Sequence, residues 1–238
     1  MRIVSLVPSL TELVYHLGRG AWLVGRTRFC DQPPEVATVP AVGGTKDPEV
    51  AAVIALRPHL VIANREENRR EDVEALTAAG LRVLVTDPNS VANACAMVRE
   101  LGGLLDAPEQ AGSLADQTLA ECRPRPDGPR VFVAVWNRPL LGLGDHSYGH
   151  DVLLQAGATN VLAGRPRYPE VSRDELAGLK PDLILLPDEP FRFRERHRAA
   201  FEEFAPTRLV DGRLLWWYGP RMPQALRGLC AIFDEVRR

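Results

Sequence analysis

The sequence contains no long hydrophobic run. None of its apolar stretches approaches the roughly 20 residues that a helix needs to cross a bilayer, so we expect no membrane-spanning segment. An excess of charge of one sign is also missing, because 29 Lys and Arg residues stand against 31 Asp and Glu residues, for a net charge of −2. No Lys/Arg cluster is interleaved with aromatic residues. This composition argues against a nucleic-acid partner.

Cysteine is sparse, with four residues and no CxxC spacing, which argues against a structural zinc site. Cys95, Cys122 and Cys230 fall within helical patterns and are expected to be small buried hydrophobic residues. We expect these three and Cys30 to be reduced thiols.

Familiar catalytic and cofactor motifs are absent as well. The chain has no nucleophile elbow, P-loop, HExxH or complete dinucleotide fingerprint, and residues 141–145 hold only a lone GxG. We therefore expect neither an enzyme nor a resident cofactor. The N-terminus has no apolar segment followed by a small-residue cleavage site, since Met1-Arg2 leads directly into the apolar residues 3–7. This start indicates either a cytoplasmic protein or a sequence trimmed to its mature form.

What the chain does contain is a regular succession of short apolar runs and helical patterns, which predicts an α/β fold with mainly parallel sheets. The predicted strands cover residues 3–7, 22–25, 60–63, 81–86, 131–135 and 183–186. The predicted helices cover residues 9–17, 72–79, 91–101, 152–156, 173–179 and 223–236, and a capping box at Ser9 and Glu12 is expected to open the first of them.

One long helix is predicted near the middle of the chain, over residues 104–122. Asp106 is its expected N-cap, Glu109 completes a capping-box spacing, and Pro108 occupies the first turn. The residues that recur every three or four positions along one face are Leu104, Ala107, Ala111, Leu114, Thr118 and Cys122. At about 1.5 Å per residue, this helix would span roughly 25 Å.

The sequence on the two sides of this helix is similar. Residues 48–50 and 56–62 on one side match residues 169–171 and 179–185 on the other, each as a short helix, a Pro-marked turn and a buried strand. We predict two lobes, residues 1–103 and 124–238, joined by a linker helix at 104–123. A small-molecule site is expected in the cleft between the lobes.

Several residues are candidates for that site or for other chemistry. Trp136, Asn137 and Arg138 follow a buried strand, where ligands of open α/β sheets bind. Trp216, Trp217 and Tyr218 are adjacent, so we expect at least one to be exposed. His146 and His150, beside Asp145 and Asp151, are either weak metal-ligand candidates or part of a capped helix start. The charged residues 64–71 are either a solvated loop and helix start or a docking surface for a charged partner.

These residues together resemble the helical-backbone (class III) substrate-binding proteins of ABC importers, and among them the cobalamin-binding proteins. The resemblance covers nearly the whole chain. It is carried by residues 3–13, by 24–25 with 31–34, and by 56–63, 168–172 and Pro220-Arg221. It implies two α/β lobes on one backbone helix, and a non-catalytic protein that hands its ligand to a permease. It further implies an extracytoplasmic location, and we expect a monomer.

The resemblance also implies which residues bind the ligand and which dock the permease. The ligand would be cobalamin or a related corrinoid, carried as cargo. Its expected contacts are Phe29, Asp31, Gly44-Thr45, Asn64, Arg65, Trp136, Asn137, Arg138, Tyr148, Tyr168, Trp216 and Trp217. The permease would be met by Glu66, Glu67 and Glu71.

Two alternatives remain open at this stage. The first is a haem or ferric-siderophore binding protein of the same fold, in which Tyr148, Tyr168 or His146 would bind iron directly. The second is a two-lobed metal-dependent hydrolase or chelatase that uses His146, His150 and Asp151.

Overall fold

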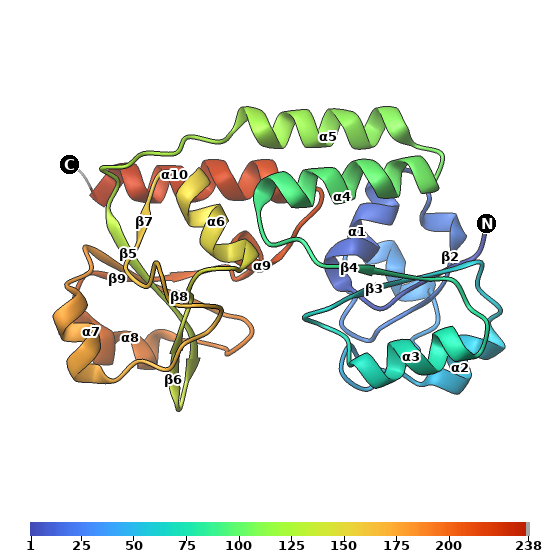
Figure 1. Ribbon diagram of the computed structural model, residues 1–238, viewed down its shortest axis with the longest axis horizontal. Helices are drawn as coiled ribbons and strands as arrows, with labels where there is room; N and C mark the ends of the chain where they lie inside the picture. The colour runs from blue at the N-terminus through green and yellow to red at the C-terminus, as the bar shows by residue number, and fades with distance from the viewer. Residues whose placement is uncertain (237–238) are drawn as a thin grey trace. The chain divides into compact units, whose positions relative to one another are not determined.

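Figure 1 shows the computed structural model, in which residues 1–236 are described. The chain divides into two compact units. Unit 1 comprises residues 1–87, 96–114 and 218–220, and unit 2 comprises residues 88–95, 115–217 and 221–238. Each unit contains its own sheet with flanking helices, as the predicted fold class requires.

Unit 1 is built on a four-stranded parallel sheet with the order β2-β1-β3-β4. The strands are β1 (Ile3–Ser5), β2 (Leu23–Arg26), β3 (Leu60–Asn64) and β4 (Val83–Thr86), and the helices are α1 (Pro8–His16), α2 (Val50–Ala55) and α3 (Arg70–Ala78), with 3-10 turns at Gly20–Trp22 and Pro34–Thr38. Strands β1 and β3 are buried along their whole length, which explains their unbroken apolar sequences.

The start of α1 differs from the predicted capping box. Helix α1 begins at Pro8 with Val7 as its N-cap, and no side chain caps it. Because proline is favoured in the first helical turn, the N-cap lies at Val7, two residues before the predicted Ser9, and Ser9 lies inside the helix. The Ser9 hydroxyl is buried without a hydrogen-bond partner among the described residues.

Unit 2 contains a five-stranded sheet in which β6-β5-β8-β9 are neighbours and β7 pairs with β5. The strands are β5 (Arg130–Asn137), β6 (Leu140–Gly142), β7 (Thr159–Asn160), β8 (Leu183–Pro187) and β9 (Thr207–Val210), of which only β6 is antiparallel. The helices are α6 (Tyr148–Gln155), α7 (Arg173–Leu179), α8 (Glu195–Glu202), α9 (Arg213–Trp216) and α10 (Met222–Val236).

The two sheets repeat one topology. If β6 is set aside, β5, β7, β8 and β9 follow the same order as β1, β2, β3 and β4, with the first strand of each set between the second and the third. The two matching sequence segments fall at equivalent places, since α2 leads into β3 and α7 leads into β8. The predicted similarity of the two halves is therefore confirmed as a structural repeat.

The helix predicted over residues 104–122 is wrong at its start. The chain forms α4 (Val91–Leu104) and then α5 (Pro108–Ala120), which lie side by side (Figure 1). Asp106 has a φ of 53° in the turn between them and is not the N-cap of α5. The amide N–H of Ala107 instead donates to the carbonyl of Gly102 at 2.8 Å, which closes α4. That residues 104–123 act as a rigid linker remains a prediction.

Gly102 permits α4 and α5 to approach each other closely. A Cβ added there would lie 2.2 Å from Cβ of Ala111 and 3.0 Å from the carbonyl oxygen of Ala107. We predict that Gly102→Ala lowers the free energy of unfolding by about 1–3 kcal/mol, because overpacking outweighs the gain in helix propensity. Urea unfolding followed by circular dichroism measures the change.

The adjacent Gly103 provides the matched control, since a Cβ there would meet no atom within 4 Å. Gly103→Ala is expected to stabilise the protein by about 0.5–1 kcal/mol, the ordinary helix preference of alanine over glycine. Equal effects of the two substitutions would show that α4 and α5 do not pack as described.

Candidate functional site

The loops at the carboxyl edge of the unit 1 sheet carry the predicted ligand-contacting residues of this half. Phe29 and Asp31 follow β2 and are both exposed, and the Phe29 side chain has 53% of its surface accessible. The Arg28 guanidinium lies 5.1 Å from the centre of the Phe29 ring and pairs with Asp47 at 2.7 Å. The exposed phenyl ring is therefore held on one side by a cation.

Asn64, at the end of β3, is a buried residue whose side chain hydrogen-bonds to the backbone of these loops. Its amide nitrogen donates to the Thr86 carbonyl at 3.0 Å and contacts the Thr86 hydroxyl at 3.1 Å, and its side-chain oxygen accepts from the amide N–H of Glu66 at 2.8 Å. The neighbouring Asn68 side chain donates to the carbonyls of Leu6 and Thr45. Asn64 is 1% exposed, so the structure gives this predicted ligand contact a supporting role.

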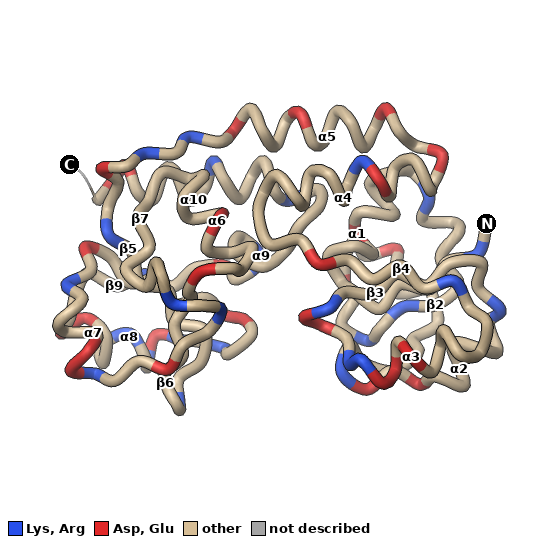
Figure 2. Tube along the Cα trace, in the orientation of Figure 1, with Lys and Arg blue, Asp and Glu red and all other residues tan. Residues whose placement is uncertain are grey.

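The other polar predictions in unit 1 lie nearer to solvent. Thr45 is half-buried, and Arg65 is exposed and pairs with Asp87 at 2.9 Å. Glu66 is exposed and Glu67 is half-buried in the loop after β3, and Glu71 is exposed in the first turn of α3, which agrees with a solvated loop and helix start. Lys and Arg positions are interspersed with Asp and Glu positions along the described residues of both units (Figure 2).

All four cysteines are free thiols, as expected. Cys95 and Cys30 are buried, whereas Cys122 and Cys230 are only half-buried, which corrects the prediction for these two. The Cys30 sulfur lies 3.1 Å from the Thr11 hydroxyl and 3.2 Å from the Thr27 hydroxyl, and burial raises the pKa of its thiol. Cys30 is therefore a structural residue behind the Phe29 loop.

The carboxyl edge of the unit 2 sheet presents a row of aromatic rings. Trp136, at the end of β5, is 41% exposed, and its ring centre lies 5.3 Å from that of Phe191 in an edge-to-face arrangement. Phe191 in turn contacts Phe193 at 4.8 Å, and Phe193 contacts Phe201 in the core at 6.0 Å. Asn137 is half-buried and Arg138 is exposed beside Trp136. Sequence patterns did not single out Phe191.

The expectation that one of three adjacent aromatics is exposed is wrong. Trp217 and Tyr218 are buried, with 8% and 6% of their surfaces accessible, and Trp216 is half-buried. Two guanidinium groups lie over the Trp217 ring, with Arg213 at 4.9 Å and Arg221 at 5.2 Å from its centre. These cation–π contacts help to explain why the ring is buried.

Glu189, which the sequence analysis missed, holds this aromatic segment in place. Its backbone carbonyl accepts a hydrogen bond from Nε1 of Trp216 at 2.7 Å, and its carboxylate accepts one from the Trp217 side chain. Burial raises the pKa of Glu189 to about 7, and the nearby Arg213 opposes this only in part.

Glu189 should make stability depend on pH in a defined direction. Because its pKa is about 7 in the folded protein and 4.5 in the unfolded chain, only the unfolded chain loses this proton between these values. The contribution of Glu189 is thus fully present below pH 4.5 and is lost as pH rises to 7. We predict that Glu189→Gln gains stability relative to wild type over this interval. Parallel urea titrations from pH 4.5 to 8 test this, and a constant difference would contradict it.

Two predicted tyrosine contacts differ in their exposure. Tyr148, in the first turn of α6, is 5% exposed, and burial raises the pKa of its hydroxyl. It is a core residue in this structure. Tyr168 is half-buried in the loop before α7.

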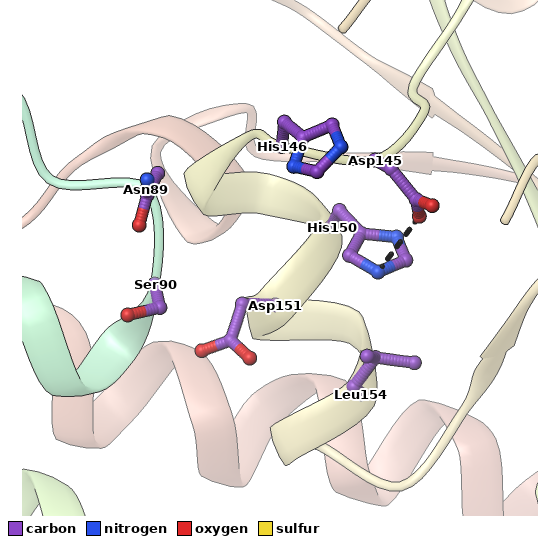
Figure 3. Close-up of a pocket in the computed structure, with 7 residues that line it drawn as sticks. All are labelled: Asn89, Ser90, Asp145, His146, His150, Asp151 and Leu154. Atoms are coloured by element: carbon purple, nitrogen blue, oxygen red, sulfur yellow. Dashed lines mark ion pairs between the residues drawn. The ribbon is translucent and has the colours of Figure 1, made fainter. Parts of the chain in front are cut away.

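The histidine pair lies beside a cavity of about 310 Å³ within unit 2 (Figure 3). Nε2 of His150 is 3.1 Å from Oδ1 of Asp145, and Nδ1 of His150 is 2.9 Å from the side-chain nitrogen of Asn160. His146 precedes α6 with a φ of 59°, so the two histidines do not share a helix face. Ser147 caps α6 by accepting from the amide N–H of His150, which confirms the capped helix start.

Nothing at this cavity supports the metal-enzyme hypothesis. Across residues 1–236, no group of three or more His, Cys, Asp or Glu side chains is arranged to hold a metal ion. Asp151 is already used to cap α4, because its carboxylate accepts from the amide N–H of Val91 at 2.6 Å.

Within residues 1–236, no helix is long and apolar enough for a membrane span.

The repeated parallel sheets, with aromatic and polar side chains at their carboxyl edges, define an α/β binding protein. The sequence profile of the periplasmic binding protein family matches residues 3–206, and the chain belongs to this family. Members of the family are non-catalytic components of transport systems, and they carry a transported ligand.

Individual relatives agree with this assignment. The vitamin B12-binding protein of Yersinia pestis (strain Pestoides F) is 29% identical over 192 residues, which cover 78% of this chain and 69% of the relative. The apo haem-binding protein of Roseiflexus sp. RS-1 superposes with a TM-score of 0.82 at 24% identity, over 100% of this chain and 99% of that one. The vitamin B12-binding protein of Vibrio cholerae gives 0.81 at 19% identity, over 100% and 98%. The last two comparisons show the fold alone.

Proposed function

We propose that the protein binds cobalamin or a related corrinoid, without catalysis, and delivers it to an ABC-type permease. The observation that carries the proposal is the 29% identity to a vitamin B12-binding protein over 78% of this chain. The chemistry of the sheet edges supports it. A corrin is a broad, amphipathic disc, and the exposed rings of Phe29 and Trp136 lie beside polar side chains that can pair with its amides.

The proposed contacts come from the loops at the carboxyl edges of both sheets. Those with accessible or partly accessible side chains are Phe29, Asp31, Thr45, Arg65, Trp136, Asn137, Arg138, Tyr168 and Trp216. Asn64, Tyr148 and Trp217 are buried and are proposed to support these loops from beneath.

Titration of the purified protein tests the ligand. Cyanocobalamin is expected to bind with one-to-one stoichiometry and a dissociation constant below about 10 µM, measured by calorimetry and visible absorbance. Haemin and a ferric siderophore are titrated in parallel. No heat and no spectral change with cyanocobalamin at this concentration would exclude the corrinoid.

A haem ligand is the second candidate. It is favoured by one structural relative, the periplasmic haem-binding protein of Pseudomonas aeruginosa, which is 27% identical with a TM-score of 0.79 over 98% of this chain and 92% of that one. For this ligand, His146 and Tyr168 are the proposed iron ligands, because His146 is exposed, Tyr168 is half-buried and Tyr148 is buried. Haemin titration should then give a coordination spectrum that His146→Ala or Tyr168→Phe abolishes.

The permease partner and the place of action are also proposals. We propose that the protein acts as a monomer outside the cytoplasmic membrane and meets its permease through Glu66, Glu67 and Glu71. The exposure of Glu66 and Glu71 supports this. The double variant Glu66→Lys/Glu71→Lys should keep its ligand affinity and lose transport, whereas unchanged transport would exclude these glutamates as docking residues.

A further inference from the structure

Three neighbouring strands of unit 2 end at the same level. In the sheet, Val133 pairs with Leu185, and Pro187 pairs with Val210. Continuing these registers places Trp136, Asp188 and Asp211 in one row at the carboxyl edge. Since neighbouring strands lie about 4.8 Å apart, this row is about 10 Å long, which is close to the width of a tetrapyrrole ring.

An open cavity of about 680 Å³ lies at the end of this row away from Trp136. Its lining residues are Asp188, Arg192, Phe193, Arg194, Leu209, Val210 and Asp211. The loop that forms one wall of the cavity also carries Phe191, which contacts the Trp136 ring at 5.3 Å. The same short loop therefore joins the exposed indole to the cavity.

The carboxylates in this cavity are engaged by the backbone. Oδ1 of Asp188 accepts from the amide N–H of Gly212 at 2.8 Å, and Oδ1 of Asp211 accepts from the amide N–H of Arg213 at 2.9 Å. Both acids thereby hold the turn that leads into α9.

The two cavity arginines are not engaged in this way. Arg192 and Arg194 are exposed, and no ion pair joins either guanidinium to a carboxylate within residues 1–236. Arg198, further along the same segment, does pair, with Glu195 at 3.3 Å and Glu202 at 2.7 Å. Among the described residues, the cavity thus contains two arginines without an ion-pair partner, beside two aspartates that each accept a backbone hydrogen bond.

We propose that Arg192 and Arg194 form a subsite for an anionic group on the rim of the flat ligand that lies against Trp136. The group is a phosphodiester, as in the nucleotide loop of cobalamin, or a carboxylate, as in the propionates of haem. A guanidinium binds either oxyanion through charge-assisted hydrogen bonds. The inference rests on the proposed function and adds a charged contact to the rim of the ligand.

Paired ligands with and without the anion test the subsite. The double variant Arg192→Gln/Arg194→Gln is expected to bind cobalamin about tenfold more weakly than wild type and to bind cobinamide, which lacks the nucleotide loop, as wild type does. Added salt should weaken cobalamin binding by the wild type more than by the variant. If haem is the ligand, the loss should affect haem and spare haem dimethyl ester.

Arg196→Gln is the matched control, because Arg196 is an exposed arginine of the same segment that does not line the cavity. It should leave all affinities unchanged. An equal loss for the anionic and the neutral ligand, or no loss at all, would overturn the subsite while leaving the proposed function standing. Failure of the wild-type protein to bind any of the four ligands would instead overturn the proposed function.

Discussion

Trp136→Ala is expected to weaken corrinoid binding at least about tenfold, because the substitution removes the most exposed aromatic face of the unit 2 sheet edge. The indole is 41% exposed and rests edge-to-face against Phe191, so its orientation is fixed before the ligand arrives. Aromatic anchors of this kind typically contribute about 2 kcal/mol or more to binding. Calorimetric titration with cyanocobalamin measures the loss, and Trp136→Phe should restore part of it.

Trp22→Ala controls for the general effect of losing a tryptophan. Trp22 lies in a 3-10 turn just before β2, at the amino end of that strand, with Arg19 over its ring at 5.0 Å. Its removal should leave the affinity unchanged. If Trp136→Ala binds as wild type does and circular dichroism shows a normal fold, Trp136 does not contact the ligand.

The parallel strands were predictable because burial on both faces leaves a continuous apolar run. Residues 3–7, 60–63, 131–135 and 183–186 all showed this pattern and all contain strands. Helix α8 and strand β9 went unpredicted for the opposite reason. Four of the eight residues 195–202 are charged, and only Phe201 is buried, so this helix depends on one anchoring ring and has no apolar stripe.

The break between α4 and α5 shows how periodicity can mislead. Both helices bury apolar residues against each other, so the apolar spacing continues across the turn at residues 105–107. Asp106 is of a residue type that is favoured at N-caps, yet it adopts a left-handed backbone conformation in the turn. Gly102 and Gly103, which separate the two predicted helices, lie inside α4, so the turn comes later in the chain than predicted.

Positions at strand ends predicted part of the candidate site, and tertiary contacts determined the rest. Phe29 and Trp136 follow strands and are exposed, as a ligand-contacting residue should be. The burial of Trp217 depends on Arg213 and Arg221, each four residues away, and on the distant Glu189, which no local pattern connects to it. Arg192 and Arg194 line a cavity only because the ends of β8 and β9 lie beside them, and no sequence pattern indicates this arrangement.

Asn64 shows most clearly why a residue predicted to contact the ligand can instead stabilise the loop beside it. As a polar residue at a strand end it had the expected character of a ligand partner. Its side chain instead hydrogen-bonds to the backbone of the loop that follows and of the neighbouring strand. It accepts from the amide N–H groups of Glu66 and Glu67, and it donates to the carbonyl of Thr86. Asn64 therefore connects the end of β3 to the end of β4 by a side-chain hydrogen bond.

Asn64→Ala is therefore expected to lower the free energy of unfolding by about 3 kcal/mol, since it removes the side-chain acceptor of two part-buried amide N–H groups and a buried donor to the Thr86 carbonyl. The midpoint of urea unfolding should fall while its slope stays the same. Asn93→Ala, at an exposed position of α4, should change stability by less than about 0.5 kcal/mol. Because the loop after β3 carries the proposed ligand contact Arg65, Asn64→Ala should also weaken ligand binding at temperatures where the protein remains folded. A variant as stable as wild type would show that the Asn64 hydrogen bonds do not hold the two strand ends together.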